Sequence, residues 1–132
     1  MNGLRVVVAE DHLEVRGIVV GILSQEFEVV DAVGDGEQLV LAVIRHKPDV
    51  IVCDIGMPLM DGPSARRHLL SRGITHPFVF ITIMDITGLA SMAAKTAIAY
   101  VHKTDMANEL NLAVRSVAMG NSYFSKLFQR MP

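Results

Sequence analysis

The stretch Val50-Ile51-Val52-Cys53 is a short apolar run that ends at a charged residue, Asp54. Its mostly β-branched residues do not alternate with polar ones, which is typical of a strand buried on both faces of a parallel sheet. Four similar runs lie outward from it along the chain: Val6–Val8, Val29–Val33, Phe78–Ile83 and Ile98–Val101. The sequence therefore predicts five buried strands.

Helical patterns separate these runs. The i, i+3, i+4, i+7, i+8 spacing of apolar residues occurs over residues 15–23 and again over residues 110–118, where Gly120-Asn121 is a helix-stop signal. Less regular helices are expected at about residues 36–46, 63–72 and 87–96. Strand and helix thus alternate five times, which predicts an α/β fold with right-handed crossovers and a single doubly wound parallel sheet.

Composition limits the classes of function. The 132 residues suit one domain, and 12 Lys plus Arg against 14 Asp plus Glu leave a net charge of −2, without the basic excess of a nucleic-acid-binding domain. The apolar runs are too short to span a membrane, and no secretory signal is visible. The single Cys53 cannot form an internal disulfide, so a reducing cytoplasm is the expected compartment.

Polar residues follow the predicted strands at the edge where open α/β sheets bind ligands. Glu10 and Asp11 follow the first strand, Asp54 ends the third, Thr82 lies in the fourth and Lys103 follows the fifth. The order of these elements places three carboxylates, a hydroxyl and an ammonium at one sheet edge.

Three carboxylates gathered at one edge repel one another unless their pKa values rise or a divalent cation binds them. Mg²⁺ suits two carboxylates plus a backbone carbonyl from a loop such as Ile55-Gly56-Met57, whereas His12 and Cys53 lack zinc-ligand spacing. Together with Lys103 and Thr82, such a site predicts phosphoryl transfer. Asp54 is the best candidate nucleophile, because it is the single carboxylate at the end of the central-looking apolar strand.

Four motifs stand out: VVVAEDH at residues 6–12, VIVCDIGMPLMDG at residues 50–62, FIT at residues 80–82 and YVHK at residues 100–103. Together they resemble a known family, the response-regulator receiver domains of two-component signalling. The resemblance spans residues 4–120. It implies a CheY-like, flavodoxin-like five-stranded parallel sheet of order 2-1-3-4-5 with five helices. Residues 1–120 would form the receiver, and residues 121–132 a C-terminal tail or the start of a linker to an absent output domain.

The resemblance also implies roles for individual residues. Asp54 is the phosphoacceptor; Asp11, Asp54 and the Gly56 carbonyl are direct Mg²⁺ ligands, with Glu10 acting through water. Lys103 pairs its ammonium with the phosphoryl group, and the Thr82 hydroxyl moves toward that group. The remaining roles are those of Tyr100, an aromatic switch that swings inward, and of Gly56 and Met84, which tune the access of water to the acyl phosphate.

The partners implied by the resemblance are a sensor histidine kinase as phosphoryl donor and a second copy of the chain, bound through a switching face formed by helix four, strand five and helix five. No membrane partner is expected. The sequence GNSYFS at residues 120–125 is similar to the receivers of NarL/LuxR-type regulators, so DNA would be reached only through a helix-turn-helix domain outside this chain. Phe124, Leu127 and Phe128 would then need a partner or further chain to cover them.

Two alternatives remain open. A pseudo-receiver would keep the fold as a phosphorylation-independent interaction module, and an Asp-nucleophile phosphatase would be an enzyme. Phosphatases of that kind carry Asp-x-Asp after the strand, whereas Asp54 is followed by Ile55-Gly56. We therefore expect a signalling domain that promotes its own phosphorylation and dephosphorylation rather than an enzyme. Thr104 follows Lys103 where some relatives have a proline in cis, so the isomer at this bond is left open.

Overall fold

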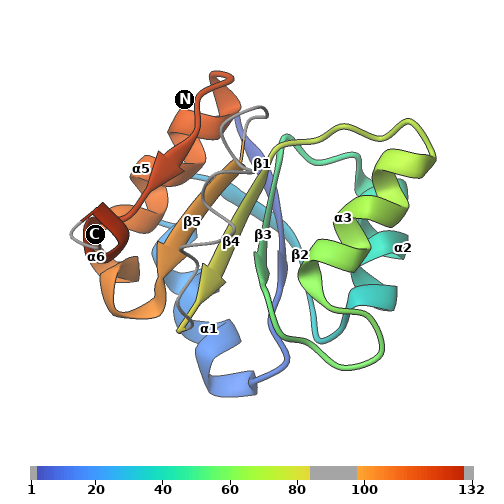
Figure 1. Cartoon of the computed structure of the whole chain (residues 1–132), viewed down its shortest axis with the longest axis horizontal. Coiled ribbons are helices and arrows are strands. Elements are labelled where there is room, and N and C mark those ends of the chain that lie inside the picture. The colour runs from blue at the N-terminus through green and yellow to red at the C-terminus, as the bar shows by residue number, and fades with distance from the viewer. Residues whose placement is uncertain (1–2, 84–97, 130–132) are drawn as a thin grey trace.

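The computed structural model describes residues 3–83 and 98–129 and shows one parallel sheet between layers of helices (Figure 1). The strand order is β2-β1-β3-β4-β5-β6. The strands are β1 Arg5–Ala9, β2 Glu28–Val33, β3 Val50–Asp54, β4 Phe78–Thr82, β5 Ile98–His102 and β6 Tyr123–Phe124. The helices are α1 Leu13–Leu23, α2 Gly36–His46, α3 Gly62–Ser71, the 3₁₀ turn η1 Lys103–Asp105, α5 Met106–Ala118 and α6 Lys126–Gln129.

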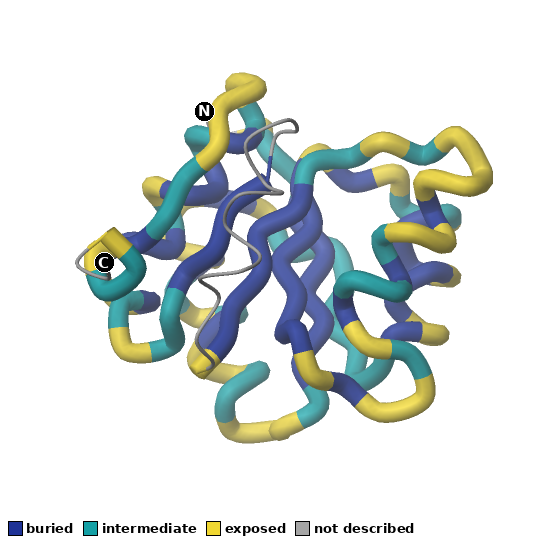
Figure 2. The backbone as a smooth tube through the Cα atoms, in the orientation of Figure 1, coloured by how far each residue is buried: buried dark blue, intermediate teal, exposed yellow. Residues whose placement is uncertain are grey.

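The two faces of the sheet pack against different helices. Every residue of β3 is buried. Ile51 and Cys53 face the cluster that α2 and α3 cover, while Val50 and Val52 face the cluster that α1 and α5 cover. Figure 2 shows the central strands as the most buried part of the backbone. Burial on both faces explains why the strand sequences lack polar alternation.

The predicted class of fold and the order 2-1-3-4-5 are confirmed, but the count of five strands is wrong by one. After α5 the chain returns to the sheet edge, where Tyr123 and Phe124 pair in parallel with Ala99 and Tyr100. A two-residue strand is too short to produce a recognisable pattern. Within the segment interpreted from sequence as a tail, residues 121–132, Tyr123 and Phe124 therefore extend the sheet and Lys126–Gln129 form α6.

Other sequence predictions on the fold have mixed outcomes. Phe124 and Phe128 pack against the core cluster on the α2 and α3 face, so the chain itself covers much of their apolar surface. The helix expected at residues 87–96 lies outside the described residues. No peptide bond within the described residues is cis, and the Lys103–Thr104 bond is trans. Within residues 3–83 and 98–129, every helix lacks the length and apolarity needed to cross a bilayer.

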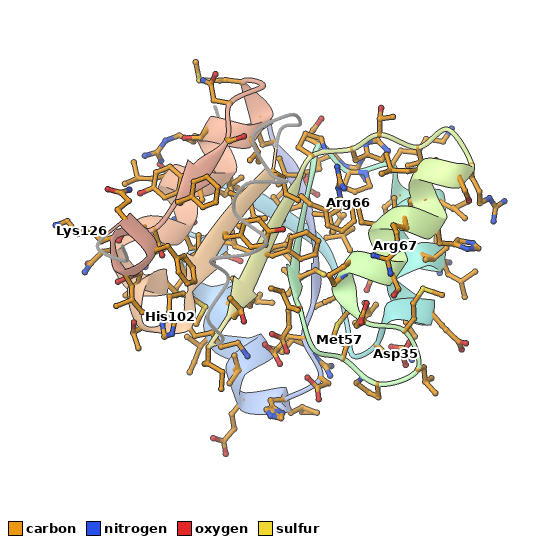
Figure 3. All side chains as sticks on the ribbon, in the orientation of Figure 1. Asp35, Met57, Arg66, Arg67, His102 and Lys126 are labelled. Atoms are coloured by element: carbon orange, nitrogen blue, oxygen red, sulfur yellow. The ribbon has the colours of Figure 1, made fainter. Side chains whose placement is uncertain are left out.

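Capping residues begin the two helices nearest the carboxyl ends of β2 and β3. The Asp35 side chain accepts a hydrogen bond from the Gln38 amide at 2.8 Å, and the Asp61 side chain accepts one from the Ser64 amide at 2.8 Å. Both aspartates therefore act as N-caps, which end the preceding loops at defined positions. In Figure 3, Asp35 and Met57 lie in these neighbouring loops, beside the carboxyl ends of the strands.

Candidate functional site

The carboxyl ends of the strands lie at the lower edge of the molecule in Figure 1. They surround an open cleft of about 250 Å³. Its lining comes from the β1–α1 turn, the end of β3 and the loop after it, the end of β4 and the turn after β5. The lining residues are Asp11, His12, Asp54, Gly56, Thr82, Ile83 and Lys103. The convergence expected from sequence is thus observed for residues distant along the chain.

An ion-pair network connects Lys103 to two of the carboxylates. The Lys103 Nζ atom lies 2.9 Å from Glu10 Oε1 and 3.5 Å from Asp54 Oδ1. Glu10 is completely buried, and its other oxygen accepts a hydrogen bond from the His12 amide at 3.1 Å. Burial alone would lower the pKa of Lys103, but the hydrogen bond to Glu10 and the charges of Asp54 and Glu10 raise it. Lys103 is therefore held as an ammonium.

Asp54 belongs to this network, and only 8% of its surface is exposed. Burial and the charge of Glu10 raise its pKa above 3.8, against the opposing effect of the Lys103 ammonium. The Lys103 ammonium thus opposes the effect of burial and of the Glu10 charge on the pKa of Asp54 without reversing it. A cation bound in the cleft would favour the ionised form of Asp54.

The oxygen atoms of the cleft are suitable ligands for a hard divalent cation. Within the described residues, Asp11 Oδ1 is a buried oxygen without a hydrogen-bond partner. Glu10, Asp11 and His12 each offer a ligand atom within 4.8 Å of the others. Carboxylate oxygens dominate the set, which suits Mg²⁺ and its retained waters. The residues present therefore fit the metal that the sequence predicts.

Two glycines that follow β3, Gly56 and Gly62, have different surroundings. The Gly62 amide donates to the Ile55 carbonyl at 2.9 Å, and a Cβ atom at Gly62 would lie 2.6 Å from the Asp54 carbonyl oxygen and 2.7 Å from Cys53 Sγ. Only glycine fits there without displacing β3. At Gly56, by contrast, a Cβ atom would meet no other atom within 4 Å. Gly56 thus leaves the mouth of the cleft open.

Two positions without a predicted role, Arg16 and Leu59, shape the loops that follow β1 and β3. Arg16 in α1 donates from Nε to the Glu10 carbonyl at 2.9 Å, which holds the β1–α1 turn. Leu59, with a φ of 67°, turns the loop after β3 although it is not glycine. Neither the Arg16 hydrogen bond nor the Leu59 conformation has a signature in local sequence, because each depends on how its loop is folded.

Thr82 and Tyr100 differ in position. Thr82 is buried at the end of β4 and lines the cleft, opposite His102 in the sheet register. Tyr100 lies in β5, two residues before His102, and is not among the residues that line the cleft. Its ring stacks on Phe80 at a centroid distance of 5.5 Å and on Phe124 at 5.9 Å. Met84 lies outside the described residues.

Cys53 is a packing residue. It is fully buried, and its Sγ atom donates to the Asp54 carbonyl at 3.3 Å. Burial, followed by the charge of Asp54, raises the pKa of the Cys53 thiol well above its ordinary value. The neutral thiol therefore contributes neither a nucleophile nor a metal ligand.

Comparison with known proteins defines the class. Residues 6–115 match the family described as the response regulator receiver domain. The chain therefore belongs to the receiver-domain family of two-component response regulators.

The curated relatives are mainly regulators. The chain is 37% identical over 125 residues to the transcriptional regulatory protein DegU of Brevibacillus brevis, covering 92% of this chain and 53% of that protein. It is 31% identical over 124 residues to the oxygen regulatory protein NreC of Staphylococcus epidermidis, covering 91% and 57%. The chain thus spans about half the length of these relatives.

Solved structures show the same fold. The receiver domain of the response regulator NarL from Mycobacterium tuberculosis superposes with a TM-score of 0.82 at 29% identity, covering 92% of this chain and all of that one. A LuxR-family regulator from Aurantimonas has a TM-score of 0.86 at 21% identity, covering 98% of this chain and 94% of that one, which shows the fold alone.

Proposed function

We propose that this receiver accepts a phosphoryl group on Asp54 from a phosphohistidine of a sensor histidine kinase, in a Mg²⁺-dependent reaction in the cytoplasm. The observation that carries the proposal is the unbalanced charge of the cleft. Glu10 and Asp54 pair with the Lys103 ammonium there, and Asp11, which lines the same cleft, has a buried oxygen without a hydrogen-bond partner within the described residues. Such a site favours binding of a cation and, with it, of phosphoryl oxygens.

In this mechanism an Asp54 carboxylate oxygen attacks the phosphorus in line. The new O–P bond forms as the P–N bond to the donor histidine breaks, and the electron pair of that bond stays on the imidazole nitrogen. Lys103 neutralises a phosphoryl oxygen, and the Thr82 hydroxyl donates to another. Asp11, Asp54 and the Gly56 carbonyl would hold Mg²⁺ directly and Glu10 through water; the ion would neutralise charge on the transferred group.

The acyl phosphate would act on a switch that includes Thr82 and Tyr100. A shift of Thr82 toward the new oxygens would change the packing around Tyr100 and thereby the face formed by β5 and α5, to which the sequence prediction adds a helix at residues 87–96. Moving this equilibrium from mostly off to mostly on takes about 5 kcal/mol. The same face would hold a second copy of the chain, a prediction that sedimentation with and without beryllofluoride tests.

The names of relatives suggest the output. DegU is named a transcriptional regulatory protein, and this chain covers about half of it. We therefore propose that the receiver controls transcription through a helix-turn-helix DNA-binding domain that is not among these residues.

The decisive experiment is treatment with acetyl phosphate and Mg²⁺, followed by intact mass measurement. We expect one added phosphoryl group, lost in Asp54→Ala and without Mg²⁺, and retained in the control Asp31→Asn, which changes a carboxylate on β2. An unmodified parent protein that also fails to bind beryllofluoride would favour the pseudo-receiver. Repeated turnover of phosphoesters would favour the phosphatase.

Gly56 offers a test of water access. Because a side chain at this position meets open space, Gly56→Asn should fold normally. We expect the variant to lose its phosphoryl group more slowly than the parent, by a few-fold, since the side chain hinders the attacking water. The half-life of the phosphorylated protein measures this effect, and an unchanged half-life would contradict it.

A further inference from the structure

The C-terminal segment, residues 121–129, binds the turn that carries Lys103. Ser125 is fully buried at the junction between β6 and α6. Its amide donates to the Tyr100 carbonyl at 3.0 Å, and its Oγ atom accepts a hydrogen bond from the His102 amide at 2.9 Å. Because His102 directly precedes Lys103, this contact fixes the backbone on the amino side of the active-site lysine.

A second set of contacts fixes the other side of the turn. The Leu127 amide donates at 3.0 Å to Oδ2 of Asp105, the last residue of the 3₁₀ turn that begins at Lys103. The Lys126 amide and the Tyr123 hydroxyl donate to Glu109, one turn further along α5. The C-terminal segment thus holds the backbone on both sides of Lys103.

Ring contacts join the same segment to the proposed switch residues. Phe124 stacks on Tyr100 with an angle of 10° between the ring planes, and Phe128 meets the His102 ring edge-on at 5.7 Å. Figure 3 shows His102 beneath the C-terminal helix that carries Lys126. His102 is also the register partner of Thr82. The proposed phosphoryl-binding residues Lys103 and Thr82 are therefore each adjacent to a residue that the segment contacts.

We propose that the C-terminal segment is a responding element of this receiver: loading of Asp54 loosens its attachment to β5 and the Lys103 turn. The inference rests on the proposed function. Lys103 Nζ now lies closer to Glu10 than to Asp54. Phosphoryl oxygens on Asp54 carry more charge than the carboxylate and draw the ammonium away from Glu10. As the backbone turn moves together with Lys103, its hydrogen bonds to Ser125 and Leu127 lengthen.

Linkage makes the coupling reciprocal: a weaker attachment of the segment must strengthen binding at Asp54. Tyr123→Phe removes the hydroxyl that donates to Glu109 at 2.6 Å and leaves every residue of the cleft intact. Asn111→Ala is a matched control, because it removes a hydrogen bond of 3.0 Å between α5 and the Ile22 carbonyl without contacting the segment.

The experiment combines two readouts on the whole chain with beryllofluoride and Mg²⁺. Fluorine NMR measures binding of the mimic, and amide hydrogen exchange with mass spectrometry measures protection of residues 121–129. We expect exchange in this segment to rise at least threefold on binding, and Tyr123→Phe to bind the mimic two- to fivefold more tightly than the parent. Asn111→Ala should bind it like the parent.

The outcomes separate this inference from the proposed function. Normal binding with unchanged or slower exchange in residues 121–129 would overturn the inference and leave the proposed function intact. Absence of binding in the parent would contradict the proposed function. In that case Lys103→Met tests whether Lys103 is coupled to residues 121–129. Loss of the Glu10 contact should still raise hydrogen exchange in this segment relative to Asp31→Asn, and no rise would overturn the inference.

Discussion

Glu109 is buried, as are Glu10 and Asp54 of the cleft, whereas Asp11 of the cleft is partly buried. These carboxylates differ in their hydrogen bonding. Glu109 Oε1 accepts from the Tyr123 hydroxyl at 2.6 Å, and the Lys126 amide lies 3.1 and 3.0 Å from its two oxygens. In the cleft, Glu10 and Asp54 share Lys103, and Asp11 Oδ1 has no partner within the described residues.

This difference separates a structural carboxylate from a functional one. Donors that reach Glu109 come from the chain itself, so its burial fixes the position of the C-terminal segment. Donors in the cleft are too few for the negative charge present, so its burial leaves capacity for a ligand. Four measurements can break or sharpen this distinction.

The largest effect is expected from Lys103→Met. The variant removes the ammonium that would neutralise a phosphoryl oxygen, and loss of one such electrostatic contact costs about 10²–10³-fold in rate. We expect the rate of Asp54 phosphorylation by acetyl phosphate to fall by about that factor. Because Glu10 then becomes a buried charge without its cation, stability should fall too. A near-parental phosphorylation rate would contradict the role given to Lys103.

The next effect concerns Glu109→Ala. Removing a carboxylate that accepts from a hydroxyl and an amide leaves both donors without a partner, and hydrogen bonds to charged groups contribute about 1.5–3 kcal/mol. We expect the free energy of unfolding in urea to fall by about 2–3 kcal/mol. The control Glu14→Ala changes an exposed glutamate of α1 and should stay within about 0.5 kcal/mol of the parent. Equal losses would refute the comparison.

Asp11→Asn should change stability in the opposite direction. Without Mg²⁺ the substitution relieves repulsion among the cleft carboxylates, so we expect a gain of about 0.5–1 kcal/mol, typical of one partly exposed charge interaction. With Mg²⁺ at ten times its dissociation constant, the parent should gain about 1.4 kcal/mol and the variant much less. Urea unfolding with and without Mg²⁺ tests both expectations; destabilisation by Asp11→Asn in Mg²⁺-free buffer would count against an unsatisfied site.

The smallest effect is a titration. Burial and the hydrogen bond to Glu109 raise the pKa of Tyr123 from 10.0 to about 12. The folded protein thus favours the neutral phenol, so this contribution to stability is complete below pH 10 and is lost as the pH rises toward 12. Ultraviolet absorbance should show Tyr123 ionising about two pH units above a free tyrosine. Tyr123→Phe should lose that step, and a Tyr123 step near pH 10 would contradict the effect of the partly buried hydrogen bond to Glu109.

Much of the fold could be predicted because its signals are local. The runs around Val52 and Ile81 are apolar without alternation, and that pattern alone indicates strands covered on both faces. The sixth strand could not be predicted in this way. Tyr123 and Phe124 are two residues long, and their pairing with β5 depends on the return of the chain after α5.

The candidate site could be predicted in membership but not in contacts. Parallel strands that end at Asp54 and Thr82, or just before Glu10, must bring these residues to one edge, whatever the details of packing. The preference of Lys103 for Glu10 over Asp54, and the contact of Arg16 with the Glu10 carbonyl, depend on side-chain directions that no spacing specifies.

The sequence by itself determined the class of fold, the sheet edge at which polar groups gather and the residue types available there, because hydrophobic periodicity and strand ends are properties of neighbours along the chain. Only the tertiary structure decided that Glu109 is satisfied while Asp11 Oδ1 has no hydrogen-bond partner among the residues that the structure describes, and that residues 121–129 hold both sides of Lys103. Hydrogen bonding and charge compensation depend on distances between residues far apart in sequence, which are set when the sheet and its helices pack.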